Sequence, residues 1–173
     1  MLRPASCGVT PEQQAAAQRL VEETRAGIAP YQDVRAALAA GYRPGPQPGD
    51  ATVHYLNPRY GGSATLDPSH PPGLVYAGTR HGPVLLGAMY QMPKVGQAGP
   101  DIGGAITPWH YHTNVCFSVP GLFVSGLSTP LGGCPPGSVR VTTADMLHVW
   151  TAPNPNGPYG DLDQAWVHRL VTA

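Results

Sequence analysis

Two histidines separated by one residue are the clearest chemical signal in this sequence. They are His110 and His112. Side chains alternate along a β-strand, so a strand over 108–117 places both imidazoles on one face, with their Cα atoms about 7 Å apart. Two imidazoles at that spacing can converge on one metal ion. The same alternation puts Asn114 and Cys116 on that face if the strand is regular.

Two more histidines complete a candidate metal site. His54 and His148 each lie between apolar neighbours in a predicted strand, so each imidazole faces away from those neighbours. One such histidine is usually a hydrogen-bonded residue of the sheet, but three strands with histidine on one side favour a shared ion. Imidazoles suit transition metals better than magnesium or calcium. The sequence predicts one transition-metal ion, copper or zinc first and iron or nickel as alternatives, bound by His54, His110, His112 and His148.

The other candidate side chains have simpler interpretations. Met89 and Met92 are expected in the core, and one of them becomes a candidate soft ligand if the ion is copper. Carboxylates are scarce near the predicted strands, and Asp67 is expected to make a turn. His70 and His168 are expected on the surface.

The chain has three cysteines, Cys7, Cys116 and Cys134. Cys116 and Cys134 are 18 positions apart across a Gly/Pro-rich stretch, and a disulfide between them is the favoured interpretation. Two alternatives stay open: Cys116 supplies a thiolate to the histidine site, or both are small buried residues. Cys7 is left unpaired.

Composition excludes several classes of protein. Ten Lys or Arg residues balance ten Asp or Glu residues among 173, so the chain lacks the basic field of a nucleic-acid-binding protein. It contains no apolar run long enough for a transmembrane helix. Motifs of nucleophilic hydrolases, P-loops and dinucleotide-binding loops are absent from the sequence. A metal ion or small molecule is the expected partner, and the sequence does not reveal the oligomeric state.

Helices are predicted at both ends of the chain. The first begins at Pro11, because Thr10 and Gln13 can form a capping box, and ends at Gly27. A second covers about 31–40 and stops at Gly41. A C-terminal helix is predicted with Asp161 as its N-cap. Its expected buried stripe is Leu162, Ala165, Trp166 and Leu170.

Between these helices the sequence reads as β-structure. A Pro/Gly-rich linker is expected over 43–50, and long loops over 94–107 and 128–137. Strands are predicted over 52–56, 73–79, 83–91, 108–117, 122–125 and 146–151.

A single domain over 1–173 follows, with a helical lead-in over 1–42 and a β-rich metal-binding core over 51–173. The fold class is α+β, with an N-terminal helical hairpin, an antiparallel sheet closing into a barrel or sandwich, and a short C-terminal helix.

Several segments resemble a group of uncharacterised exported bacterial proteins. They are AAGY at 39–42, HYLN at 54–57, LDP at 66–68 followed by PGLVY at 72–76, and LHVW at 147–150 followed by NPNGPY at 154–159. The group has no established activity, so the resemblance implies an extracytoplasmic location, either exported or membrane-tethered. Many of its members have Glu where this chain has Met89, which disfavours a carboxylate mechanism.

The function expected from these observations is mononuclear metal binding at a histidine-rich site. An ion with an open position supports a metalloenzyme that uses metal-bound water or O₂, whereas four protein ligands indicate a copper- or zinc-binding protein. The alternative is an extracytoplasmic interaction module without metal, whose long loops form the binding surface. Residues 1–10 lack the apolar segment of an intact signal peptide, and a natural start at Met1 would indicate a cytoplasmic protein.

Overall fold

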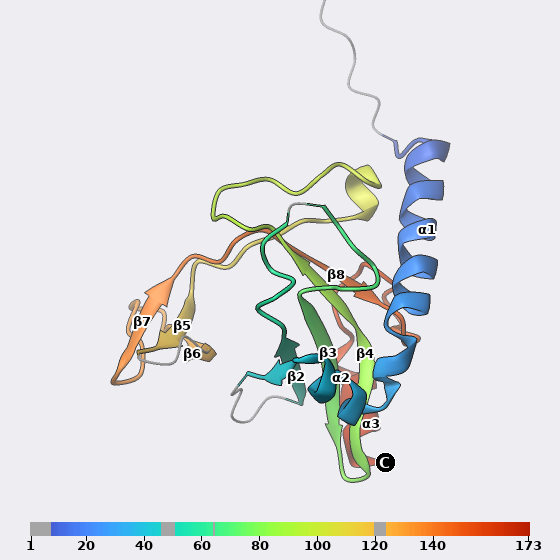
Figure 1. Ribbon diagram of the computed structural model, residues 1–173. Coiled ribbons are helices and arrows are strands. Elements are labelled where there is room, and N and C mark those ends of the chain that lie inside the picture. The colour runs from blue at the N-terminus through green and yellow to red at the C-terminus, as the bar shows by residue number, and fades with distance from the viewer. Residues whose placement is uncertain (1–7, 46–50, 64, 120–123) are drawn as a thin grey trace, which may run out of the picture.

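The computed structural model describes residues 8–45, 51–63, 65–119 and 124–173 (Figure 1). The fold is α+β, as expected, with antiparallel sheets between N-terminal and C-terminal helices. The helices are α1 (Pro11–Gly27), α2 (Val34–Ala40) and α3 (Gln164–Thr172), with short 3₁₀ turns η1 (Ala29–Gln32) and η2 (Gly104–Ile106). The strands are β1 (Arg43–Pro44), β2 (Thr52–Leu56), β3 (Gly73–Thr79), β4 (Gly82–Gln91), β5 (Val115–Ser118), β6 (Val124–Leu127), β7 (Ser138–Val141) and β8 (Met146–Trp150).

The strands form two separate antiparallel sheets. The large sheet has the order β1-β2-β3-β4-β8, and the small sheet has the order β6-β5-β7. Figure 1 shows the small sheet on one side of the large sheet and α1 on the other. No closed barrel forms within the described residues, because β5, β6 and β7 pair with one another and β8 ends the large sheet. Of the two arrangements expected from the sequence, a barrel or a sandwich, the barrel is therefore not observed in this part of the chain, whereas two separate sheets are compatible with a sandwich.

Helix α1 covers one face of the large sheet. It begins as predicted, with Thr10 and Gln13 in a capping box and Pro11 in the first turn. Its buried side packs against the face of the sheet that includes Leu74, Tyr76, Tyr90 and Leu147. Two buried hydrogen bonds tie it there, one between the hydroxyls of Thr24 and Tyr90 and one from the Tyr159 hydroxyl to the carbonyl of Ala17. All three hydroxyls are thus satisfied inside the apolar layer.

The segment after α1 differs from the prediction in two places. The expected helix over 31–40 is split into η1 and α2, because Asp33 takes an extended conformation and caps α2. Gly41 ends α2 in the left-handed conformation, with φ 103°, as expected. The linker predicted over 43–50 begins instead as β1, which pairs with β2; residues 46–50 lie outside the described residues.

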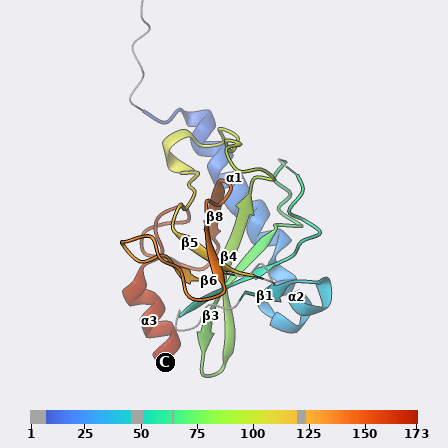
Figure 2. The ribbon, with the colours of Figure 1, turned by 90° about the vertical axis from the view of Figure 1, so that its left-hand side faces the viewer.

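Helix α3 covers part of the opposite face (Figure 2). Its N-cap is Asp163 and not Asp161, since the Asp163 carboxylate accepts from the backbone N–H of Trp166. Val167 is the fully buried residue of this helix, while Ala165 is exposed. The predicted stripe is therefore wrong at Ala165, because the side of the helix that packs against the sheet carries Trp166, Val167, Leu170 and Val171.

The strand expected over 108–117 is mostly absent. Residues 108–114 form a loop with one isolated bridge, between His110 and Met146, and the strand itself is Val115–Ser118. Two stretches, 110–119 and 124–146, leave the large sheet together and carry the small sheet; we call them the arm. The predicted strand over 122–125 is observed as Val124–Leu127 within the described residues, and β7 was not predicted.

A disulfide between Cys116 and Cys134 closes the arm. The favoured pairing is confirmed, so Cys116 is not a thiolate ligand. Cys7 lies outside the described residues. In the parts of the chain that the structure describes, the helices are too short or too polar to cross a membrane.

Candidate metal centre

The four predicted histidines lie together, although they come from distant parts of the chain. Their rings form a continuous row in the order His112, His110, His148, His54. Successive ring centroids are 5.4, 5.3 and 5.5 Å apart. His70 and His168 are exposed, as expected, and neither they nor the exposed His81 take part in these ring contacts.

His54 and His148 belong to different strands of the large sheet. His54 on β2 pairs with Val75 on β3, while His148 on β8 pairs with Met89 on β4. Two strands therefore separate them, yet their Nε2 atoms are 3.2 Å apart. The two side chains lean toward each other across the face that α1 leaves uncovered. Both imidazoles face away from their apolar strand neighbours, as predicted, and this places them on the same face of the sheet.

Glycine at position 87 permits the close approach of β4 and β8. A Cβ atom there would overlap the carbonyl oxygen of Val149 and crowd the Cα of Trp150. Gly87 pairs with Trp150, two positions from His148. The close backbone contact helps to fix the place of His148 on the sheet.

His110 reaches the row from the base of the arm. Its backbone exchanges two hydrogen bonds with Met146, at 3.0 and 2.7 Å. Trp109, the residue before His110, is anchored because its indole N–H donates to the carbonyl of Pro100. The His110 Nδ1 lies 3.2 Å from the carbonyl of Pro108. A carbonyl can only accept, so Nδ1 carries a proton, and in the neutral ring Nε2 keeps a lone pair that can bind a metal ion.

His112 is the most exposed member of the row. Its backbone N–H donates to the hydroxyl of Thr143 at 2.9 Å, and its carbonyl accepts from the Thr143 N–H at 2.8 Å. These bonds join the two stretches of the arm next to the large sheet. His110 and His112 share one side here because of this bridge, and not because of a regular strand.

The spacing within the row matches that of ligands on one ion. Two imidazole nitrogens bound to a tetrahedral ion at about 2.0–2.1 Å lie about 3.3 Å apart, with ring centroids about 5 Å apart. The His54 and His148 nitrogens meet the first condition, and all three neighbouring ring pairs are close to the second. Within the described residues, however, no three histidine, cysteine or carboxylate side chains form a preformed metal site. Coordination by three or four histidines therefore requires side chains of the row to move.

The row also changes the acid–base behaviour of its members. Burial lowers the pKa of His148 to about 3, with smaller contributions from the neighbouring His54, His110 and His112. Burial and the nearby His110 also lower the pKa of His112. Protonation places positive charge among neighbouring imidazoles and is disfavoured. Neutral imidazole is the form that binds a metal ion.

Sequence reasoning missed one aromatic neighbour of the row. The indole of Trp150 stacks on His148, with a centroid distance of 5.1 Å and an interplanar angle of 12°. Its N–H donates to the carbonyl of Gly160 at 2.7 Å, which holds the ring in place. The spacing of His148 and Trp150 in one strand was the available signal, since residues two apart share a face.

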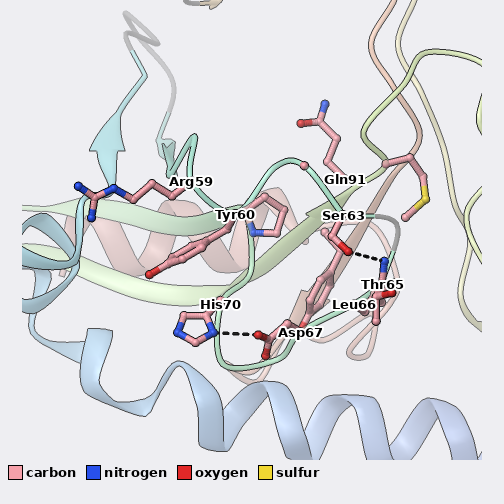
Figure 3. A pocket seen from close by; sticks show the side chains of 12 residues that line it. Arg59, Tyr60, Ser63, Thr65, Leu66, Asp67, His70 and Gln91 are labelled. Atoms are coloured by element: carbon pink, nitrogen blue, oxygen red, sulfur yellow. Dashed lines mark hydrogen bonds and ion pairs between the residues drawn. The ribbon is translucent and has the colours of Figure 1, made fainter.

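A separate pocket lies beside β4, lined in part by Tyr60, Asp67, His70 and Gln91 (Figure 3). The Nδ1 atom of His70 is 2.8 Å from the Asp67 carboxylate, and Tyr60 lies against the His70 ring. Asp67 also accepts from the Ser69 N–H, which confirms its predicted turn role. The His70 contact and this turn lower the pKa of Asp67.

Comparison of the chain with protein-family models, with curated proteins and with solved structures finds no match.

Proposed function

We propose that this protein binds one transition-metal ion at the row of histidines. The ligands are His54, His148 and His110, with His112 as the fourth. The observation that carries the proposal is the 3.2 Å separation of the His54 and His148 Nε2 atoms, with two further imidazoles continuing the row. The same separation also fits a hydrogen bond between two neutral imidazoles, so metal uptake is the deciding measurement.

The coordination number decides the chemistry of the site. Three histidines leave a coordination position open for water or O₂, and the ion then acts as a Lewis acid or activates O₂. Four histidines close the site, and the protein is then a copper or zinc carrier. The partly exposed position of His112 favours an exchangeable fourth ligand. An extracytoplasmic location is part of the proposal, because the Cys116–Cys134 disulfide is typical of an oxidising compartment.

Metal uptake by untagged protein tests the proposal. We expect roughly one equivalent of Zn(II) or Cu per chain at micromolar concentration. The double variant His110→Ala with His112→Ala should lose this uptake and keep its fold, since both residues lie in the loop at the base of the arm. His70→Ala with His81→Ala is the matched control and should keep it. A wild-type chain that takes up no Zn, Cu, Fe or Ni would contradict the proposal.

One observation favours the second function, an interaction module. The arm exposes several large apolar side chains: Val119, Leu127, Leu131 and Val139. Leu131 is 99% exposed, in the loop predicted as a binding surface. The other predicted loop, 94–107, is less suited, because Ile102 and Ile106 pack against the core beside α1. Concentration-dependent association that Leu127→Ser with Leu131→Ser abolishes, in metal-free protein, would support this function.

A further inference from the structure

Two methionines border the row of histidines on the same face of the large sheet. Met89 on β4 is the direct cross-strand partner of His148, and Met146 lies two residues before His148 on β8. Met146 is also the bridge partner of His110. Both are buried, at 5% and 7% exposure, in one apolar cluster with Trp150. A thioether therefore accompanies each of the two central histidines.

The Met89 side chain reaches from β4 over its cross-strand neighbour Gly73 on β3. Its terminal methyl lies 2.9 Å from the point where a Cβ on Gly73 would be. Gly73 is the β3 neighbour of Met89, and it pairs on its other side with Leu56 of β2. The side chain thus crosses from β4 over β3 toward the strand of His54. Glycine at position 73 leaves the room for it.

A site of imidazoles and thioethers is neutral and soft. Thioether sulfur favours Cu(I), whereas Zn(II) gains little from it and prefers imidazole, thiolate or carboxylate. Charge leads to the same conclusion. A monovalent ion in a half-buried site with neutral ligands has a smaller desolvation penalty than a divalent ion.

We propose that the ion of this site is Cu(I), bound by the imidazoles of His54, His110 and His148 and by one thioether, from Met89 or from Met146. This inference rests on the proposed metal-binding function and names its ion. His112, at the exposed end of the row, binds the ion first and then transfers it to the buried ligands. No change of oxidation state is required, since Cu(I) is both the ion delivered and the ion held.

The test compares Cu(I) and Zn(II) affinities of methionine variants in which leucine conserves side-chain volume. Every protein carries Cys7→Ser, because a free thiol would bind either ion. Cu(I) affinity is measured without oxygen by competition with bathocuproine disulfonate, and Zn(II) affinity by competition with a chromogenic chelator. We expect Met89→Leu with Met146→Leu to weaken Cu(I) binding by about tenfold or more and to change Zn(II) binding by less than about threefold.

Met92→Leu is the matched control. Met92 is buried as well, but it lines the separate pocket and should leave both affinities unchanged. X-ray absorption of the Cu(I) protein should show sulfur scattering in the wild type and none in the double variant. Unchanged Cu(I) affinity in the double variant, or an equal loss in Met92→Leu, overturns the copper assignment. If the protein still binds Zn(II) in that case, the proposed metal-binding function stands. Failure of the wild type to bind either ion overturns both.

Discussion

The large sheet and the arm are held in shape by different interactions. The large sheet has helices on both faces, and side chains such as Leu74, Tyr76 and Leu86 are almost fully buried in its two apolar layers. The small sheet of the arm is short, and its strands expose apolar side chains such as Leu127 and Val139. Burial stabilises the first region, whereas a disulfide and local hydrogen bonds stabilise the second.

The row of histidines lies where these two regions meet. His54 and His148 belong to the large sheet, while His110 and His112 belong to the base of the arm. The first pair belongs to a packed framework, whereas the second is held by hydrogen bonds across the two stretches of the arm. The row therefore joins two side chains of the framework to two side chains of a less buried region. Each prediction below tests this contrast.

The largest expected effect is on the packing of the large sheet. Leu147 is 1% exposed in the layer beneath α1, so Leu147→Ala should lower the free energy of unfolding by about 2–5 kcal/mol. Val139 of the small sheet is 50% exposed, and Val139→Ala should change it by less than about 0.5 kcal/mol. Denaturant unfolding of both variants measures the contrast. Equal losses would mean that the arm is packed as tightly as the large sheet.

The disulfide should matter mainly to the arm. Replacement of Cys116 and Cys134 by Ser removes a link across 18 positions, worth about 3 kcal/mol in the chain-entropy account. Amide hydrogen exchange should accelerate in β5 and β7 and stay slow in β3 and β4. The wild type without reductant is the control. Faster exchange throughout the large sheet would show that the arm supports the framework.

A smaller effect, counted per pH unit, is expected from acidification of the metal-free protein. The pKa of His148 is about 3 in the folded protein, below the usual value near 6.5 of an unfolded chain. The unfolded state therefore binds more protons between these values, and stability should fall as pH decreases from about 6.5 toward 3. One group contributes at most about 1.4 kcal/mol per pH unit. Melting curves with a chelator measure this slope.

The matched variant for the pH experiment is His148→Asn, which has no group that titrates in this range. Its slope over the same pH range should be shallower than that of the wild type. His168→Asn changes an exposed histidine on α3 and should leave the slope as it is. Equal slopes in wild type and His148→Asn would show that His148 is readily protonated in the folded protein.

The smallest effect is expected at the base of the arm, where it meets the large sheet. Thr143→Val keeps the shape of the side chain and removes the hydroxyl that accepts from the His112 N–H. We expect a loss of about 0.5–1.5 kcal/mol and faster exchange of the His112 amide. Thr129→Val, in the loop that follows β6, removes a comparable local bond to the Gly133 N–H and is the control. Unchanged exchange at His112 would mean that the bond does not hold the base of the arm.

Much of the framework was predictable from the sequence, because its signals are local. The start of α1 depends on groups three residues apart, Thr10 and Gln13, and the apolar strands over 52–56, 73–79 and 146–150 show their pairing faces directly. The four histidines were predicted as a group from the same alternation. Their gathering in one row agrees with that prediction, while metal binding itself stays a proposal.

The arm shows where local reasoning failed. A regular strand over 108–117 was predicted because its residues favour β-structure, but the hydrogen bonds of His110 and His112 go to Met146 and Thr143, more than thirty positions away. Similarly, Asp161 was predicted as the N-cap of α3, but Asp163 takes that position. The Asp163 N–H donates to the side-chain oxygen of Asn154, which holds the turn before the helix. Partners so distant in sequence leave no local pattern.

The sequence by itself determined which residues alternate, where α1 begins and which histidines face away from apolar neighbours, because these features depend on the geometry of a few consecutive residues. Only the tertiary structure decided that His54 and His148 meet across two intervening strands, that Trp150 stacks on His148, and that Met89 and Met146 border the row. Strand order and register set these distances, and both follow from the packing of the whole sheet against α1 and α3.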